Sequence, residues 1–343
     1  MVSYSKIVSP LLDWYEKNHR NLPWREGNDP YRIWVSEIML QQTRVEAVKD
    51  YYSRFLQAFP TVYHLAQATE DSLMKLWEGL GYYSRAKNLQ KAAKIIVEQY
   101  GGIFPSSYED ILSLPGVGEY TAGAIASIAF NLPYAAVDGN VLRVLSRLSA
   151  DDAFIDDPKT KKRAFEALTA VYPVKAGDFT QSIMELGATV CVPNGAPHCN
   201  RCPLAHLCIS HKKGEEQLRP FKKPKRERTK TDITVFLLRA GNLYAIEKRE
   251  EKGVLFGLYQ FPSLLGQTTI EQRIAHLESL GAHHLKVGYE THKKHVFTHV
   301  EWNMTATVFR CEKPFGPFLW VTEEELSGSI GLPSAFRTFF PFS

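Results

Sequence analysis

The sequence of 343 residues has few cysteines, no long apolar segment and no marked excess of one charge. Because no apolar run reaches the roughly 18 residues that a membrane-spanning helix needs, we expect no membrane partner. The N-terminal residues lack the charged start and the apolar stretch of a secretory signal. Five cysteines in a chain of this length do not form a disulfide scaffold. We therefore expect a soluble intracellular protein.

The formal net charge of +4 says little about a nucleic-acid partner, but the positive charge is unevenly distributed. Residues 209–232 hold nine Lys or Arg against four acidic residues, which is a local net charge of +5. A charge run of this kind is usually a solvated linker, and Pro220 and Pro224 favour a linker here. The same positive charges could also contact phosphates, so both interpretations stay open.

Hydrophobic periodicity divides the chain into a helical part and a mixed part. Residues 1–208 carry apolar side chains at helical spacing, with Pro and Gly at the breaks. Residues 233–239 and 242–249 predict two strands joined by a short turn. The sequence therefore predicts an all-α, two-lobed body over residues 1–208, a basic linker over 209–232 and a small α+β domain over 233–343.

Two glycines, Gly116 and Gly118, flank Val117 between two helical patterns at about residues 111–131. Glycines one residue apart permit a tight turn, and they leave backbone N–H groups open to a phosphate at the start of the next helix. An ordinary corner between helices would show the same pair. The small residues of 122–126 indicate close packing of the second helix, which is consistent with a helix-hairpin-helix DNA clamp.

Two acidic residues, Glu37 and Asp138, stand where a carboxylate could act on a substrate. Asp138 precedes a helical segment, where its ordinary role is to cap the helix. Glu37 lies in an apolar stretch and either occupies the wet face of a helix or is buried, which would raise its pKa. Cleavage of a purine glycosidic bond needs an acid for the leaving base and an ionised carboxylate for the sugar. Spacing alone does not decide between these roles.

Four segments resemble the helix-hairpin-helix DNA glycosylase superfamily, and more closely its MutY branch of adenine glycosylases. They are Leu22–Arg25, Trp34–Thr43, Leu114–Thr121 and Val137–Val141. The resemblance implies a base-excision-repair enzyme that flips adenine out of double-stranded DNA and hydrolyses its glycosidic bond. The adenine would be mispaired with 8-oxoguanine or guanine. We expect a monomer, associated with the nucleoid in the cytoplasm of a bacterial-type cell.

The resemblance also implies a role for each matching residue. Glu37 would protonate N7 of adenine, and Asp138 would stabilise the sugar cation or attack it. Tyr120 stands where the endonuclease III branch has a lysine that forms a Schiff base, so a glycosylase without efficient lyase activity is expected. The implied contacts are Trp24, Arg25 and Gln181 for the adenine pocket, Gln42, Thr43, Leu80 and Tyr82 around 8-oxoguanine, and Gly116, Val117 and Gly118 for the DNA backbone.

Two other classes of protein fit the sequence less well. An endonuclease III-like glycosylase and lyase is disfavoured because Tyr120 replaces the lysine and a second domain is present. A lesion-binding protein without catalysis is disfavoured because both Glu37 and Asp138 are retained beside the clamp.

Four of the five cysteines, Cys191, Cys199, Cys202 and Cys208, crowd into 18 positions with the spacing C-x7-C-x2-C-x5-C. Cysteine thiolates hold zinc or an iron–sulfur cluster, and the spacing does not decide between them. The family pattern is C-x6-C-x2-C-x5-C around a [4Fe–4S] cluster. A loop absorbs one extra residue easily. The resemblance therefore implies a [4Fe–4S] cluster with a structural role or a role in engaging DNA.

The segment 233–343 resembles the Nudix-related domain that is appended to MutY proteins. The paired glutamates that hold magnesium in Nudix hydrolases do not follow Pro262, so we expect no pyrophosphatase activity. Phe297, Thr298 and His299 resemble a Phe-Ser-His loop that inspects 8-oxoguanine in the family. Thr298 keeps the hydroxyl, but its methyl group restricts the rotamer. The alternative is that Phe297 packs in the core while Thr298 and His299 lie on a turn.

Overall fold

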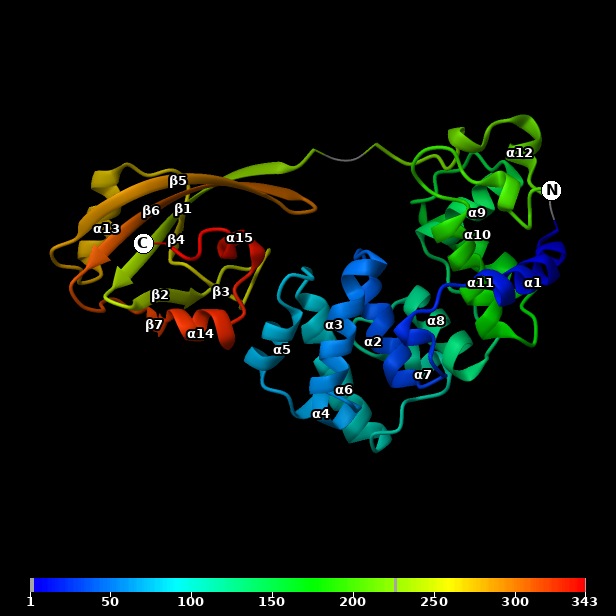
Figure 1. Ribbon diagram of the computed structural model, residues 1–343, viewed down its shortest axis with the longest axis horizontal. Coiled ribbons are helices and arrows are strands. Elements are labelled where there is room, and N and C mark those ends of the chain that lie inside the picture. The colour runs from blue at the N-terminus through cyan, green and yellow to red at the C-terminus, as the bar shows by residue number, and fades with distance from the viewer. Residues whose placement is uncertain (1–2, 225–226, 343) are drawn as a thin grey trace. The chain divides into compact units, whose positions relative to one another are not determined.

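The computed structural model describes residues 3–224 and 227–342, and the chain divides into two compact units (Figure 1). The first unit comprises the residues up to Gln67 together with Lys87–Pro224. The second comprises Ala68–Ala86 and the residues after Pro224. The second unit thus includes a short segment that is embedded in the helical part of the sequence.

In the described residues of the first unit, all of the regular secondary structure is helical. Its elements are η1 (Tyr4–Ile7), α1 (Val8–Asn18), η2 (Pro23–Arg25), α2 (Pro30–Leu40), α3 (Val45–Ala58), α4 (Val62–Gln67), α6 (Ser84–Tyr100), α7 (Tyr108–Ser113), α8 (Glu119–Phe130), α9 (Gly139–Ser149), α10 (Pro158–Thr169), α11 (Ala176–Thr189), η3 (Cys199–Arg201), α12 (Ile209–Lys213) and η4 (Glu216–Leu218). The first residues of α6 belong to the second unit.

Helix α8 lies at the centre of this unit and packs against α2, α7 and α11. Its residues 121–127 are all buried, which explains why they are small or apolar. A Cβ atom at Gly123 would lie 2.1 Å from the carbonyl oxygen of Ala135, so only glycine allows this close approach. The packing of α8 therefore positions α2 and the segment at Ala135 that precedes α9.

The second unit is built on a mixed sheet with the strand order β3-β2-β1-β6-β5, to which β4 and β7 are added beside β1 and β2. Its elements are β1 (Thr229–Ala240), β2 (Leu243–Lys248), β3 (Tyr259–Gln260), β4 (Ser263–Leu265), β5 (Lys286–Val296), β6 (Val300–Cys311), β7 (Leu319–Thr322), α5 (Glu70–Trp77), α13 (Ile270–Ser279), α14 (Glu323–Gly328) and α15 (Ser334–Arg337). The long central strands β1 and β6 run parallel, from Thr229 opposite Val300 to Ala240 opposite Cys311.

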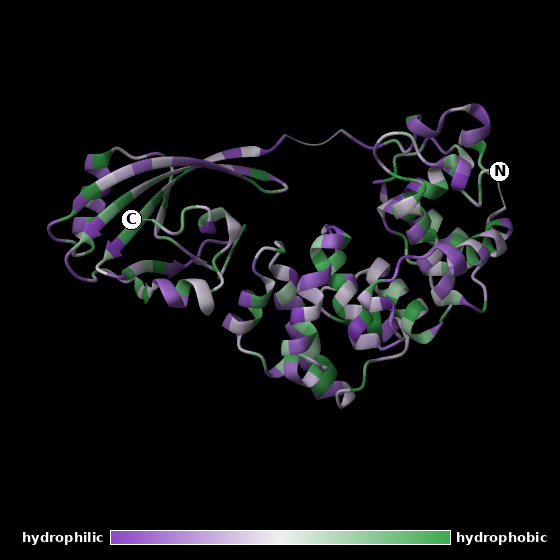
Figure 2. Cartoon of the chain, in the orientation of Figure 1, coloured by the Kyte–Doolittle hydropathy of each residue, from purple (hydrophilic) through white to green (hydrophobic). Residues whose placement is uncertain are grey.

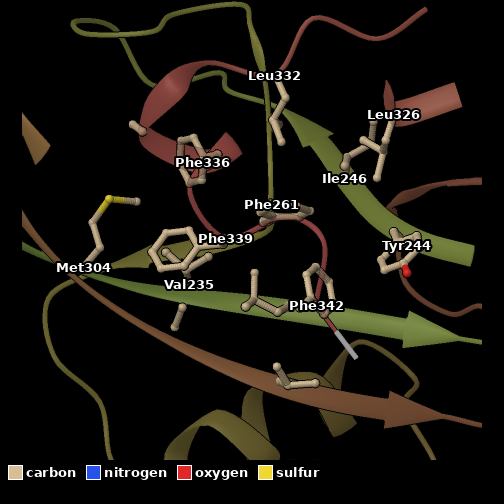
Figure 3. Close-up of a cluster of buried hydrophobic side chains, with 14 of the residues drawn as sticks. Val235, Tyr244, Ile246, Phe261, Met304, Leu326, Leu332, Phe336, Phe339 and Phe342 are labelled. Atoms are coloured by element: carbon tan, nitrogen blue, oxygen red, sulfur yellow. The ribbon is translucent and has the colours of Figure 1, made fainter. Parts of the chain in front are cut away.

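Alternate side chains of β1 enter two different cores. Val235 and Leu237 pack with Phe261 and Phe336 on one face, where Figure 3 shows the aromatic rings gathered over the strands. Phe236 and Leu238 pack on the other face with Leu277 of α13. The neighbouring edge strand β5 is exposed along most of its length and largely hydrophilic (Figure 2).

This architecture confirms the predicted fold class, an α-helical body and a small α+β domain. The predicted linker over residues 209–232 contains α12, η4 and the first residues of β1. Of its basic residues, Lys225 and Arg226 lie outside the described residues. Within the described ranges, no helix has the length and apolar character needed to cross a membrane.

Candidate active site

Glu37 lies on α2, which begins where Asp29 caps the helix and Pro30 occupies its first turn. The side chain is buried, with 6% of the residue exposed. Its Oε2 accepts a hydrogen bond of 2.7 Å from the phenol of Tyr120, the second residue of α8. Burial raises the pKa of Glu37 to about 7, against the lowering effect of the Tyr120 hydrogen bond. Glu37 is therefore able to carry a proton near neutral pH.

Asp138 caps α9 with one carboxylate oxygen and is held through the other. The Val141 N–H donates to Oδ1 at 2.8 Å, and the side-chain amide of Asn140 donates to Oδ2 at 2.7 Å. Burial raises the pKa of Asp138, while these two hydrogen bonds lower it. The Asp138 carboxylate lies close enough to Glu37 to raise the pKa of Glu37 further. Capping and a chemical role are thus compatible in the same carboxylate.

Tyr120 places a neutral phenol near both of these acids. Burial, with Glu37 and Asp138 nearby, raises the pKa of Tyr120 well above its usual value. The hydroxyl therefore stays protonated and donates to Glu37, and it offers no amine for a covalent intermediate.

A chain of hydrogen bonds leads from Asp138 to the cysteine segment. Asn140 binds Asp138, and Arg143 donates to Oδ1 of Asn140 at 2.8 Å. The same guanidinium donates to the carbonyl oxygens of Cys191 at 2.8 Å and Gly187 at 2.7 Å. Arg143 is only 6% exposed, so this arrangement is fixed inside the protein.

Arg25, one of the residues predicted for the adenine pocket, is held by an acidic residue that the sequence did not point to. Glu185 is fully buried on α11 and binds Arg25 at 2.8 Å and Arg20 at 2.7 Å. Gln181 lies one turn before Glu185, so both side chains face the same side of α11. Trp24 is buried beside Arg25, with its ring edge-on to Tyr52 at 5.5 Å. The only sequence signal for Glu185 was its position between the apolar residues Met184 and Leu186.

The predicted helix-hairpin-helix is formed by α7, a turn at residues 114–118 and α8. Gly116 has a φ of 79°, and a Cβ there would lie 2.7 Å from Cβ of Asn88. The Val117 N–H is used within the turn, since it donates to the carbonyl of Leu114 at 3.1 Å. Gly118 caps α8, whose first N–H groups have no partner in their own helix.

The residues predicted around 8-oxoguanine fall in both units. Gln42 and Thr43 follow α2 in the first unit, where Gln42 adopts a φ of 59°. Leu80 and Tyr82 belong to the second unit, and Tyr82 has a φ of 48°. A non-glycine residue at positive φ is strained, and such strain is common where a side chain must be presented to a ligand.

Within the second unit, the structure brings Tyr82 to the loop between β5 and β6. The Tyr82 and Thr298 hydroxyls lie 2.8 Å apart and share a hydrogen bond. Phe297 packs edge-on against Trp302 at 4.9 Å, while Thr298 and His299 are exposed on the turn. Phe297 therefore anchors the loop, and the two polar residues are free to face a partner.

The four clustered cysteines line one small cavity together with Arg147, His211 and Glu216. Burial raises the pKa of Cys199 to about 11 and of Cys202 to about 12, so neither thiol ionises readily without a cation. Arg147 donates to the Cys191 sulfur at 3.3 Å. The segment between Cys191 and Cys199, which holds the extra residue of the first spacing, includes Gly195 at a φ of 73°.

The spacing of these ligand atoms tests the kind of metal site. Within residues 3–224 and 227–342, the one group whose ligand atoms all lie within 4.8 Å of one another is Cys199, His211 and Glu216. Four sulfurs on a single zinc would lie about 3.8 Å apart, given tetrahedral geometry and Zn–S bonds of about 2.3 Å. Within the described residues no three of the four sulfurs form such a group, so their geometry does not match four thiolates on one zinc ion.

Both the helical part and the C-terminal part of the chain match known protein families. Residues 35–170 match the HhH-GPD superfamily of base excision DNA repair proteins, and residues 234–341 match the NUDIX domain. The solved structure of a thermostable thymine-DNA glycosylase is similar to this chain with a TM-score of 0.55 and 30% identity, over 61% of this chain and 97% of that one. The chain is thus a helix-hairpin-helix base-excision-repair protein with a Nudix-type C-terminal domain.

Individual relatives narrow the family further. The chain is 38% identical over 265 residues to an adenine DNA glycosylase of Buchnera aphidicola subsp. Baizongia pistaciae, covering 76% of this chain and 74% of that protein. It is 40% identical over 301 residues to an adenine DNA glycosylase of Arabidopsis thaliana, covering 76% of this chain and 48% of that protein. The chain thus spans about half the length of the plant relative. It belongs to the adenine DNA glycosylase family, whose members hydrolyse N-glycosyl bonds in base excision repair.

Proposed function

We propose that this protein is a monofunctional adenine DNA glycosylase that removes adenine mispaired with 8-oxoguanine or with guanine in double-stranded DNA. One observation carries the proposal: a buried glutamate with a pKa of about 7 is held by a phenol at 2.7 Å, beside a second carboxylate. That pair supplies the acid and the ionised carboxylate that glycosidic hydrolysis needs. The family membership of the chain supports adenine as the base.

In the proposed reaction, Glu37 gives its proton to N7 of the extruded adenine. The bond between N9 and C1′ then breaks, and its electron pair stays on the departing base. Asp138, whose ionised form is favoured by Asn140 and the Val141 N–H, stabilises the positive charge that develops on the sugar. Water adds to C1′ and gives up a proton to a carboxylate, which leaves an abasic site.

Tyr120 limits the chemistry to hydrolysis. A lyase reaction needs an amine that attacks C1′ and forms a Schiff base, and a phenol with a strongly raised pKa provides neither an amine nor an anion. We therefore expect an intact strand at the abasic site. The products would be free adenine and a duplex that breaks only after treatment with alkali.

We further propose that the base opposite adenine is read by Gln42, Thr43, Leu80 and Tyr82 together with the loop of Phe297, Thr298 and His299. Trp24, Arg25 and Gln181 would line the adenine pocket, and the turn of Gly116, Val117 and Gly118 would lie against the phosphate backbone. The positive φ angles of Gln42 and Tyr82 support a role in entering the base stack. The protein would act as a monomer on nucleoid DNA in the cytoplasm of a bacterial-type cell.

Cys191, Cys199, Cys202 and Cys208 would hold a [4Fe–4S] cluster. The gathering of these four cysteines around one small cavity supports an iron–sulfur group at this place. Bound there, the cluster would supply structural cross-linking of residues 191–208 rather than any step of base removal. The hydrogen bond from Arg143 to the Cys191 carbonyl ties this segment to Asn140 and Asp138.

A single-turnover assay on a duplex with one adenine opposite 8-oxoguanine tests the function directly. Half of each sample is treated with alkali, and both halves are resolved by length. Scission only after alkali is the expected result. Scission without alkali would reveal a lyase nucleophile, as in an endonuclease III-like enzyme. No scission in either half, with retained binding, would instead indicate a lesion-binding protein without catalysis.

A further inference from the structure

Helix α5 and the turn after it belong to the same compact unit as the C-terminal domain, although the sequence places them inside the helical body. The contact between α5 and the C-terminal domain is close at Gly331. A Cβ at Gly331 would lie 3.1 Å from both the carbonyl carbon and the oxygen of Met74. The chain between α14 and α15 therefore fits directly against the backbone of α5.

Three charged side chains, Lys75, Glu78 and Arg337, close this contact, and we call them the α5 clamp. Lys75 donates to Glu78 at 2.9 Å and to the carbonyl oxygen of Ser327 at 2.7 Å. Arg337 reaches the other oxygen of Glu78 through two nitrogens, at 2.8 and 2.7 Å, and also donates to the Leu326 carbonyl at 3.0 Å. The Glu78 side chain is 17% exposed and joins the two cations.

The α5 clamp lies immediately before the turn that carries Leu80 and Tyr82. Glu78 is the residue that ends α5, and Gly79 and Gly81 follow with φ angles of 96° and 71°. The Trp77 indole donates to the Gly81 carbonyl at 3.1 Å, which holds the turn against the end of the helix. At the far end of this turn, Tyr82 meets the Thr298 hydroxyl. Glu78 is therefore four residues from Tyr82, in a turn that is hydrogen-bonded to the end of its own helix.

We propose that Glu78 is a positioning residue for discrimination between 8-oxoguanine and guanine. It touches neither base nor sugar in this scheme; by bridging Lys75 and Arg337 it fixes Leu80 and Tyr82 relative to the Thr298 loop. Removing its charge leaves two half-buried cations facing each other, and partly buried ion networks respond strongly to the loss of one member. The inference rests on the proposed function, because it assumes that this turn and this loop read the base opposite adenine.

The test compares adenine release from A opposite 8-oxoguanine with release from A opposite guanine, under single-turnover conditions in the full chain. Glu78→Gln is expected to lower the ratio of the two rates by about tenfold, mainly by slowing the 8-oxoguanine substrate. Arg337→Ala should do the same, and the double variant should be no worse than either single change because all three residues act together. Arg337→Lys should restore part of the ratio.

Asp71→Asn is the matched control. Asp71 is also an acidic residue of α5, but its ion pair with Lys248 is 3.9 Å long and both side chains are exposed. Such a pair contributes little, so the ratio of the two release rates should stay at the wild-type value. The melting temperature of each variant is measured alongside. If Glu78→Gln melts too low to assay, Arg337→Lys and Arg337→Ala carry the comparison.

The outcomes separate this inference from the proposed function. Absence of adenine release by the wild-type protein would overturn the proposed function itself. A selective wild-type enzyme whose ratio is unchanged by Glu78→Gln would overturn only the positioning role. An equal fall of both rates would also overturn it, since it would show a general loss of folding or catalysis.

Discussion

The phenol of Tyr120 donates a hydrogen bond of 2.7 Å to a carboxylate oxygen of Glu37, although the two residues are 83 positions apart in the sequence. The bond joins the start of α8 to the middle of α2, two helices that pack together. It stabilises the ionised form of Glu37, while burial of the same group favours the protonated form. The balance leaves the pKa near the pH at which a general acid is most useful.

Replacing Glu37 by Gln should abolish adenine release while leaving lesion binding intact. The amide has nearly the same shape but cannot give a proton to adenine, and loss of a general acid lowers the rate by roughly 10²–10⁴-fold. Single-turnover release and DNA binding by the same preparation are the two measurements. Glu16→Gln, on the exposed face of α1, is the control and should leave both unchanged. Normal release by Glu37→Gln would remove the general-acid role.

The rate of the wild-type enzyme should fall as the pH rises through about 7, because Glu37 then loses the proton it must donate. Tyr120→Phe removes a hydrogen bond that lowers this pKa, so the alkaline limb should move to higher pH. A pH profile of the single-turnover rate for both proteins measures the shift. An alkaline limb that stays in place, or moves to lower pH, would show that Glu37 does not control it.

Glu37 should also make the folded state less stable at high pH. Its pKa is raised from 4.5 to about 7 on folding, so the folded protein holds a proton that the unfolded chain releases. The stabilisation is present below the unfolded pKa and is lost as the pH rises through the folded value, by an amount on the order of 3 kcal/mol. The free energy of unfolding by denaturant is measured at pH 5 and pH 8 for the wild type and for Glu37→Gln, and its change with pH is compared between the two proteins. Identical pH dependence in both proteins would contradict the burial of an ionisable Glu37.

Arg143→Ala should lower both the iron content and the rate of adenine release. Arg143 is buried and binds both Asn140 and the Cys191 carbonyl. Its loss releases the cysteine segment and also removes the hydrogen bond that holds Asn140, the residue that supports Asp138. The absorbance of an iron–sulfur chromophore per mole of protein reports the first effect, and single-turnover kinetics the second. Asn140→Ala is the matched variant. It removes the support of Asp138 without touching Cys191, so it should reduce the rate at normal iron content.

The sequence predicted much of this arrangement because most of its signals are local. Helical periodicity, the glycine pair of the hairpin and the cap at Asp138 each lie within a few adjacent residues. Whether Glu37 faces water or is buried could not be decided, because α8 covers it from 83 residues away in the sequence. Glu185 was missed for a similar reason: its partner Arg25 lies 160 residues earlier in the chain.

The sequence pattern also did not predict that Ala68–Ala86 belong to the same unit as the C-terminal domain. The apolar spacing of α5 is that of any helix in the body, and nothing local shows that Glu78 binds Arg337, 259 residues later. This grouping changes how the C-terminal domain should be tested. Deleting residues 233–343 would also remove the partner of α5, so a loss of selectivity after deletion would not isolate the Thr298 loop. Single side-chain changes are the sharper probe.

Tyr82→Phe and Thr298→Ala should each weaken the preference for 8-oxoguanine over guanine opposite adenine, by about two- to tenfold. Each change removes one hydroxyl of a pair that is 2.8 Å apart, and a single exposed hydrogen bond contributes about 0.5–1.5 kcal/mol. The ratio of single-turnover rates on the two substrates is the measurement. Tyr289→Phe, a half-exposed tyrosine on β5, is the control.

The double variant shows whether the two hydroxyls act through each other. If Tyr82 works by fixing Thr298, the double change should equal the larger single change, because the first substitution already destroys the hydrogen bond. If each hydroxyl contacts DNA separately, the two effects should add. Full additivity, or no effect of either change, would contradict a role for this hydrogen bond in discrimination. Sub-additive losses would make the Tyr82–Thr298 pair a single recognition element, built from two segments that lie 216 residues apart in the sequence.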